Sequence, residues 1–158
     1  KGIYLYNSYE HDEEGFSTED AEMAQKGVEK RLLKIKDILE NEKDIFNYYG
    51  NKKASILIVS WGSTKGAALE AINQFKIQNS KFKVNYLHLN WINPFPKEAV
   101  LRILGKAKKV IDVEENYEGQ MAGWIREQTG IEIKDKILKY DGRPFYPEDI
   151  IEGVKKYA

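Results

Sequence analysis

The sequence predicts an α/β domain with three layers, in which helices cover both faces of a mainly parallel sheet. A continuous apolar run at residues 54–60 is typical of a strand that is buried on both faces. From there to the end of the chain, strand-like runs alternate with segments of helical spacing. Repeated strand–helix–strand units have right-handed crossovers, and they place helices on both sides of a parallel sheet.

The first part of the chain follows a different pattern. Residues 1–20 have no sustained period and carry an acidic cluster, so we expect an irregular arm there. A helix is expected from Ala21 to about Glu40, with Ser17 or Thr18 as its N-cap. One stripe of that helix is apolar, formed by Val28, Leu32, Ile35 and Leu39.

The remaining elements are expected in regular alternation. The predicted strands are a short aromatic edge strand at 45–50 and four longer strands at 54–60, 83–89, 109–115 and 131–140. The predicted helices lie at 63–76, from Pro96 onward, around Met121 up to a terminal Gly130, and from Pro147 onward. We therefore divide the chain into an arm at 1–20, a leading helix at 21–44 and an α/β domain at 45–158.

Composition excludes several classes of protein. The 158 residues carry 25 basic and 25 acidic side chains, a balance that argues against nucleic acid or an anionic membrane as the main partner. Without cysteine, the chain offers no disulfide, no thiol nucleophile and no cysteine ligand for an iron–sulfur cluster. No apolar run approaches the roughly 20 residues that span a bilayer, and we expect a cytoplasmic location. Because the chain starts at Lys1 without Met, we expect a piece of a longer polypeptide.

A glycine turn, Gly62-Ser63-Thr64, is expected where the strand at 54–60 meets the following helix. Backbone N–H groups at such a helix N-terminus can hold a phosphate or a carboxylate, with Ser63 and Thr64 as further donors. The segment matches neither a P-loop nor G-x-G-x-x-G, and it serves equally well as a tight turn with a helix cap. We favour the structural turn and keep anion binding as the alternative.

The acidic segment of the arm sets His11 among the carboxylates of Glu10, Asp12, Glu13 and Glu14. Carboxylates with an imidazole can bind a divalent metal, but the spacing fits neither H-E-x-x-H nor an EF-hand loop. We therefore predict no metal site and favour a polar linker that docks on a neighbour. The other histidine, His88, lies in a predicted strand and is expected to be a hydrogen-bonded structural residue.

A dense group of polar side chains follows the third long strand. Adjacent strand residues point to opposite faces, so Glu114 and Glu115 cannot act together as general acid and base. A structural explanation makes Asn116 or Glu118 the N-cap of the helix that starts at Gly119. We therefore predict no catalytic residue in this chain.

The carboxyl ends of parallel strands meet at one edge of a sheet, where α/β proteins place their functional surfaces. Gly119 and Gly123 permit close backbone approach at this edge, and tyrosine is a favoured residue at protein interfaces. We expect contact with another subunit through Glu114, Glu115, Asn116, Tyr117 and Gln120, together with His11 of the arm.

Five motifs, in this order, resemble the C-terminal part of the alpha subunit of 2-oxoacid:ferredoxin oxidoreductases. They are EHDEEG, SWGSTKGA, LHLNWINPFP, VEENYEGQMAG and ILKYDGRPF, and the resemblance covers about residues 10–150. The fourth motif looks nearer to the 2-oxoglutarate type than to the pyruvate type. The resemblance implies a fold similar to the transketolase C-terminal domain, with a mainly parallel five-stranded sheet and one antiparallel edge strand at 45–50.

The resemblance also implies a place in a larger enzyme. That enzyme would oxidatively decarboxylate a 2-oxoacid on thiamine diphosphate with Mg²⁺, pass electrons through iron–sulfur clusters to ferredoxin, and form an acyl-coenzyme A. These cofactors would lie on other domains or subunits and none on this chain, whose role would be subunit assembly. The implied partners are the beta subunit, further gamma or delta subunits and, indirectly, ferredoxin. The alternative is a module that binds an anion such as a coenzyme A phosphate.

Overall fold

The computed structural model describes residues 8–50, 54–77 and 83–157. The chain divides into two compact units, Lys1–Glu42 and Lys43–Ala158. No helix within the described residues is long and apolar enough to cross a membrane.

The first unit contains a single long helix, α1 (Ala21–Asn41). Its N-cap is Asp20, whose carboxylate accepts a hydrogen bond from the N–H of Met23 at 2.9 Å. The expectation of Ser17 or Thr18 as the cap is therefore wrong. The Thr18 hydroxyl instead accepts the N–H of Asp20, because that geometry orients the capping residue itself.

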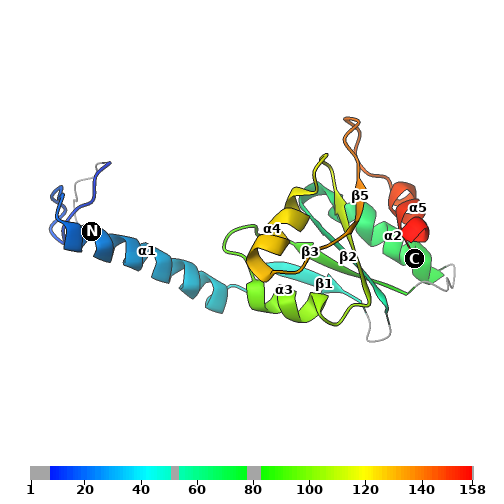
Figure 1. Cartoon of the computed structure of the whole chain (residues 1–158), viewed down its shortest axis with the longest axis horizontal. Coiled ribbons are helices and arrows are strands. Elements are labelled where there is room, and N and C mark those ends of the chain that lie inside the picture. The colour runs from blue at the N-terminus through cyan, green and yellow to red at the C-terminus, as the bar shows by residue number, and fades with distance from the viewer. Residues whose placement is uncertain (1–7, 51–53, 78–82, 158) are drawn as a thin grey trace. The chain divides into compact units, whose positions relative to one another are not determined.

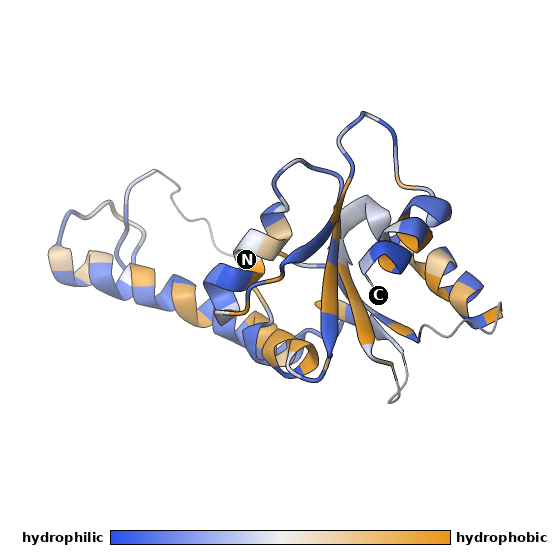
Figure 2. Cartoon of the chain, turned by 45° about the vertical axis from the view of Figure 1, so that its right-hand side comes forward, coloured by the Kyte–Doolittle hydropathy of each residue, from blue (hydrophilic) through white to orange (hydrophobic). Residues whose placement is uncertain are grey.

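The apolar stripe of α1 has no cover among the described residues. No residue of this helix is buried, and the side chains of Val28 and Leu32 are 47% and 60% exposed. Figure 2 shows apolar bands alternating with hydrophilic ones along the helix. An amphipathic helix gains most of its stability from packing of such a stripe, so this one is suited to a contact outside its own unit.

The second unit is built on a five-stranded sheet. The strands are β1 (Phe46–Tyr49), β2 (Ile56–Trp61), β3 (Val84–Leu89), β4 (Lys109–Glu114) and β5 (Asp135–Leu138), in the spatial order β1-β3-β2-β4-β5. β1 pairs antiparallel with β3, and the other neighbours are parallel. The predicted sheet, mainly parallel with one antiparallel edge strand, is confirmed.

Four helices cover the two faces of this sheet. They are α2 (Lys65–Ile77), which follows the short 3₁₀ turn η1 (Gly62–Thr64), then α3 (Lys97–Leu104), α4 (Gln120–Thr129) and α5 (Pro147–Tyr157). One core cluster packs α2 and α5 on one face, and a second packs α3 and α4 on the other (Figure 1). Three layers result, as predicted, because the central strands are apolar on both sides.

The boundaries of α4 and α5 could be predicted from the sequence, whereas those of β5 could not. Gly130 ends α4 with a left-handed φ of 77°, and Pro147 begins α5, both as expected. β5 pairs over only four residues, although a strand was expected over 131–140. Ile133 of that segment is instead buried in the core cluster on the α3 and α4 face without pairing in the sheet.

Candidate functional site

The edge at the carboxyl ends of the parallel strands is organised around β2 and β4, which are neighbours in the sheet. The chain leaves β2 toward α2 on one face, and it leaves β4 toward α4 on the other. Two neighbouring strands whose connections diverge in this way form a topological switch point, the usual place for a ligand crevice in an α/β sheet. The side chains at this point therefore decide what the edge can do.

Glu114, the last residue of β4, lies fully buried at the switch point. Its carboxylate accepts the indole N–H of Trp61 from β2 at 3.0 Å and the side-chain amide of Asn116 at 2.7 Å. It also accepts the backbone N–H groups of Met121 at 2.9 Å and Ala122 at 3.1 Å, in the first turn of α4. Glu114 thus joins β2, β4 and α4, and it occupies the helix end where negative charge is favoured.

The burial of Glu114 changes the expectation that its side chain meets another subunit. Both carboxylate oxygens accept donors of this chain, and the side chain has no exposed surface. Burial by itself raises the pKa of Glu114, but the hydrogen bonds around it outweigh burial and leave the pKa below its ordinary value. Glu114 is therefore a charged structural residue whose donors are all internal.

Glu115 has the opposite environment, although it is the next residue. Its side chain is exposed, and its carboxylate accepts the hydroxyl of Ser63 at 3.1 Å and the backbone N–H of Phe145 at 3.0 Å. These bonds connect the loop after β4 to the turn after β2 and to the segment before α5. The prediction that the two acids point to opposite faces explains this difference.

The proposed anion donors are used within the chain. The Ser63 hydroxyl is donated to the carboxylate of Glu115, so a negative charge already lies beside it. Thr64 is buried, and its hydroxyl lies 2.7 Å from Ser60 Oγ and 2.8 Å from the carbonyl of Trp61. Gly62 has a positive φ of 61°, which the tight turn requires. The geometry favours the structural turn at Gly62-Ser63-Thr64 and disfavours an anion site.

The loop between β4 and α4 is held by Asn116 and carries an exposed tyrosine. Asn116 Oδ1 accepts the N–H groups of Glu118 at 3.1 Å and Gly119 at 2.7 Å, so the amide caps this loop as expected. Tyr117 is 71% exposed, and its ring meets that of Tyr140, 64% exposed, edge to face at 5.0 Å. Two exposed rings on adjacent loops form the aromatic pair Tyr117–Tyr140. Gln120 is also exposed, at the start of α4.

A buried polar network on the opposite face of the sheet was not expected from the sequence. The Tyr86 hydroxyl lies 2.7 Å from Ser60 Oγ and 2.8 Å from Nδ1 of His88. Burial, followed by the charge of Lys65, lowers the pKa of His88 to about 4, and burial raises the pKa of Tyr86. His88 is thus a neutral, hydrogen-bonded residue, as predicted. In the sequence, the signal for this network was the alternation of Tyr86 and His88 along β3.

Asp112 is a second group that sequence reasoning missed. It is fully buried two residues before Glu114, on the same side of β4. Neither of its carboxyl oxygens has a hydrogen-bond partner in the structure. Burial, then the neighbouring Glu114, raises the pKa of Asp112 to about 9. A carboxyl residue in the middle of an otherwise apolar strand was the available signal.

His11 lies in the first unit, exposed, with its Nδ1 2.8 Å from the carbonyl of Asp12. Its neighbour Glu10 pairs with Arg31 of α1 at 2.6 Å. Among the described residues, no group of three or more histidine, cysteine, aspartate or glutamate side chains could hold a metal ion. The structure therefore gives the acidic segment a role in binding α1.

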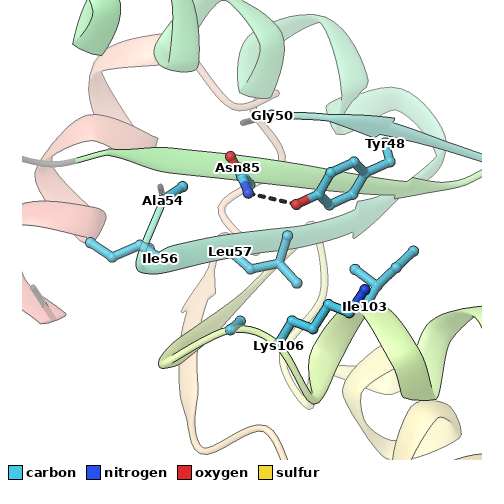
Figure 3. Close-up of a pocket in the computed structure, with 9 residues that line it drawn as sticks. Tyr48, Gly50, Ala54, Ile56, Leu57, Asn85, Ile103 and Lys106 are labelled. Atoms are coloured by element: carbon cyan, nitrogen blue, oxygen red, sulfur yellow. Dashed lines mark hydrogen bonds between the residues drawn. The ribbon is translucent and has the colours of Figure 1, made fainter. Parts of the chain in front are cut away.

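A cavity of about 460 Å³ opens at the opposite edge of the sheet, between β1, β2, β3 and the end of α3 (Figure 3). Its walls are mainly apolar, with Leu57 and Ile103 among them. The two polar side chains from the sheet, Asn85 and the Tyr48 hydroxyl, are hydrogen-bonded to each other at 2.5 Å (Figure 3). Lys106, after the end of α3, adds one ammonium group, so the described lining offers one charged group and one internally bonded polar pair with which to orient a substrate.

The fold class is shared with transketolases. The chain is similar to a split-gene transketolase, with a TM-score of 0.54 and 18% identity over 70% of this chain and 40% of that one. At this identity the likeness concerns the fold, a three-layer domain of the transketolase C-terminal type. It confirms the fold that the motifs implied.

Residues 54–150 match the family described as pyruvate:ferredoxin oxidoreductase core domain II, and the chain belongs to this family. It is 38% identical to the 2-oxoacid:ferredoxin oxidoreductase subunit alpha of Saccharolobus solfataricus, over 95% of this chain and 24% of that protein. Subunit alpha of the 2-oxoacid:ferredoxin oxidoreductase 1 of Aeropyrum pernix is also 38% identical, over 96% of this chain and 24% of its own length. The chain therefore spans about a quarter of these relatives.

Solved structures agree with these sequence matches. A 2-oxoglutarate:ferredoxin oxidoreductase from Magnetococcus marinus, determined with 2-oxoglutarate, coenzyme A and succinyl-CoA bound, is similar with a TM-score of 0.87 and 28% identity. The match covers 98% of this chain and 26% of that one. The alpha chain of a probable 2-oxoacid ferredoxin oxidoreductase from Thermoplasma acidophilum is 41% identical, with a TM-score of 0.51 over 73% of this chain and 97% of that one.

Proposed function

We propose that this chain is a non-catalytic domain of the alpha subunit of a thiamine-diphosphate-dependent 2-oxoacid:ferredoxin oxidoreductase, and that it serves subunit assembly. The whole enzyme would oxidatively decarboxylate a 2-oxoacid, reduce ferredoxin and form an acyl-coenzyme A. The proposal rests on one observation above all: the switch point is closed by hydrogen bonds within the chain, while the aromatic pair Tyr117–Tyr140 beside it is exposed.

The residues at this edge fit none of the enzyme's cofactors. Glu114 and Glu115 place two carboxylates where a diphosphate or a coenzyme A phosphate would have to approach, and like charges repel strongly at short range. The sequence has no cysteine with which to ligate an iron–sulfur cluster. Thiamine diphosphate, Mg²⁺, the iron–sulfur clusters and coenzyme A are therefore assigned to other domains or subunits, and no reaction step is assigned to this chain.

The contact surface that we propose lies around the switch point and consists of the exposed residues Glu115, Tyr117, Gln120 and Tyr140 together with the half-buried Asn116. Its partner would be the beta subunit, with gamma or delta subunits where the enzyme has them. Exposed tyrosines are frequent anchors in such interfaces, and a carboxylate at the rim pairs well with a cationic donor. His11 of the first unit would belong to a second contact.

Binding to the separately produced beta subunit tests this proposal. Tyr117→Ala and Tyr140→Ala should each weaken association about tenfold or more, because truncation of an aromatic anchor costs roughly 2 kcal/mol. Ile77→Ala is the matched control, because Ile77 is equally exposed but lies at the far end of α2. Unchanged affinity in both tyrosine variants, with normal folding, would contradict the proposed surface.

Calorimetry with thiamine diphosphate and Mg²⁺ tests the assignment of the cofactors. The 158-residue chain should release no heat of binding, and micromolar binding would contradict a purely structural role. Sulfate tests the alternative anion module: an anion that binds the folded chain must raise its melting temperature with concentration. We expect no such rise, since Ser63 and Thr64 already donate within the chain.

A further inference from the structure

Asp112 poses a problem that the proposed assembly role does not solve. Its carboxyl group lies fully buried in the central part of the sheet, and neither oxygen has a hydrogen-bond partner. A buried polar group without a partner is costly, and a buried charge without one is more costly still. A counter-ion in reach would remove that cost, so the position of the nearest cation is informative.

The edge strand β5, a neighbour of β4 in the sheet, supplies such a cation. Lys136 of β5 is the register partner of Asp112, and residues paired in this way point to the same face of a sheet. Its ammonium group nevertheless does not pair with Asp112. It donates instead to the backbone carbonyl of Glu118 at 3.1 Å, in the loop between β4 and α4.

Gly119 gives Lys136 the room to make that contact. A Cβ at position 119 would lie 2.9 Å from both Cδ and Nζ of Lys136, and this glycine has a φ of 73° that other residues rarely adopt. The loop is therefore shaped around the lysine end. Lys136 has two possible acceptors, the Glu118 carbonyl and the Asp112 carboxyl, and the structure shows it at the first.

We propose that Asp112, Lys136 and the loop 115–119 form a proton-linked switch. In the arrangement observed, Lys136 binds the Glu118 carbonyl and does not pair with Asp112, and we assign this arrangement to the protonated form of Asp112. When Asp112 loses its proton to solvent, its new negative charge draws the Lys136 ammonium away from the loop. The carbonyl of Glu118 then loses its donor, and the loop is released from β5.

The charges around Asp112 support this exchange. On β4 itself, Glu114 stays ionised and opposes a second negative charge. On β5, Lys136 is the group that favours ionisation. On β2 the register partner is Val59, and the helices on this face contribute apolar residues to the core cluster, such as Val100 and Ile125. Glu114 and Lys136 are thus the described charges that set the proton affinity of Asp112.

Lys136 can change acceptors without a shift of the sheet. Neighbouring strands are about 4.8 Å apart, which is within the reach of a lysine side chain that turns about its own bonds. The loop carries Tyr117, so the consequence for a partner rests on the proposed function. Binding of a partner that prefers one form of the loop would be coupled to uptake or release of a proton by Asp112. The switch itself requires no partner, so its test is independent of that function.

Nuclear magnetic resonance of the 158-residue chain tests the switch. The carboxyl carbon of Asp112 should titrate with a midpoint near 9, and the amide signals of Gly119 and Gln120 should shift with the same midpoint. A midpoint in the ordinary carboxyl range, or loop amides that stay unchanged while Asp112 titrates, would overturn the proposal. Both outcomes are read in the unaltered chain, so no variant has to fold.

Two variants sharpen the result. In Lys136→Met the pKa of Asp112 should rise further, because the cation that favours ionisation is gone, and the loop amides should no longer follow the titration. In Asp112→Asn the loop amides should show no transition in this range. Loop shifts of equal size in Lys136→Met and in the unaltered chain would mean that the lysine is not the moving part, and the proposal would fail.

Discussion

The substitution Glu114→Gln tests the structural assignment of the switch point most directly. The carboxylate of Glu114 accepts four donors, from Trp61, Asn116, Met121 and Ala122. Glutamine has nearly the same shape, but one oxygen becomes an amide NH₂ that faces donors instead of accepting from them. If Oε1 is replaced, the N–H of Ala122 loses its acceptor; if Oε2 is replaced, both Trp61 and Asn116 lose theirs.

The size of the effect follows from these contacts. Leaving one buried donor unsatisfied costs about 1–3 kcal/mol, and each remaining bond weakens when the acceptor loses its charge, by roughly 1 kcal/mol. With one donor lost and three bonds weakened, we expect a loss of about 4–6 kcal/mol in the free energy of unfolding. Domains of this size are stable by only about 5–15 kcal/mol, so the variant should remain folded at 25 °C but melt roughly 10 °C lower.

Urea and thermal unfolding of the 158-residue chain measure this loss, with Glu115→Gln as the matched control. Glu115 is the neighbouring acid, but it is exposed and accepts only Ser63 and the N–H of Phe145. Its substitution should cost less than about 1 kcal/mol, as is usual for exposed polar groups. Equal effects of the two substitutions, or a Glu114→Gln loss below 1 kcal/mol, would refute the assignment of Glu114 as the residue that joins β2, β4 and α4.

Three further predictions concern stability. Asp112→Asn should stabilise the chain increasingly as the pH rises from 4 to 9, by several kcal/mol at pH 8. The folded-state pKa of Asp112, about 9, lies above its unfolded value, so the unaltered protein loses stability as the pH rises through that window. Urea unfolding against pH measures this difference between the two proteins. The unaltered protein should lose at most about 3 kcal/mol of stability between pH 6.5 and 4, because the folded-state pKa of His88, about 4, lies below its unfolded value and acid favours the unfolded chain. His88→Gln should remove this loss. Gly50→Ala should cost about 1–3 kcal/mol in thermal unfolding, because its Cβ would lie 2.1 Å from Oδ1 of Asn85. Gly66→Ala is the control: position 66 lies in α2, a Cβ there would have no atom within 4 Å, and the substitution should be neutral or stabilising.

The sheet could be predicted from the sequence because its signal is local. The segment 54–60 contains four consecutive apolar residues at 56–59, and such a short run is typical of a strand covered on both faces. The boundaries of α4 and α5 are set by Gly130 and Pro147, whose backbone preferences do not depend on the rest of the fold. The segment 131–134 was mistaken for a strand because an apolar pattern reports burial and does not report pairing.

The switch point could be predicted only in part. Alternation along β4 correctly separates Glu114 from Glu115, but it does not indicate which of the two is buried. That depends on Trp61, 53 residues earlier, whose indole meets Glu114 only after β2 and β4 have paired. The prediction of the N-cap of α1 was wrong for a simpler reason. Ser17, Thr18 and Asp20 are all good caps, and the helix begins after the last of them.

Burial of one acid and exposure of the next have a joint consequence for assembly. A surface binds a partner more tightly when its loops are already ordered, since less conformational entropy is lost on association. Glu114 orders the loop after β4 through Asn116 and the first turn of α4, while Glu115 connects that loop to the turn after β2 and to the segment before α5. The aromatic pair Tyr117–Tyr140 is thereby presented on a base of internal hydrogen bonds. Under the proposed function, the carboxylates at this strand end fix a surface whose binding groups are the neighbouring rings, and this would explain why acidic residues gather there.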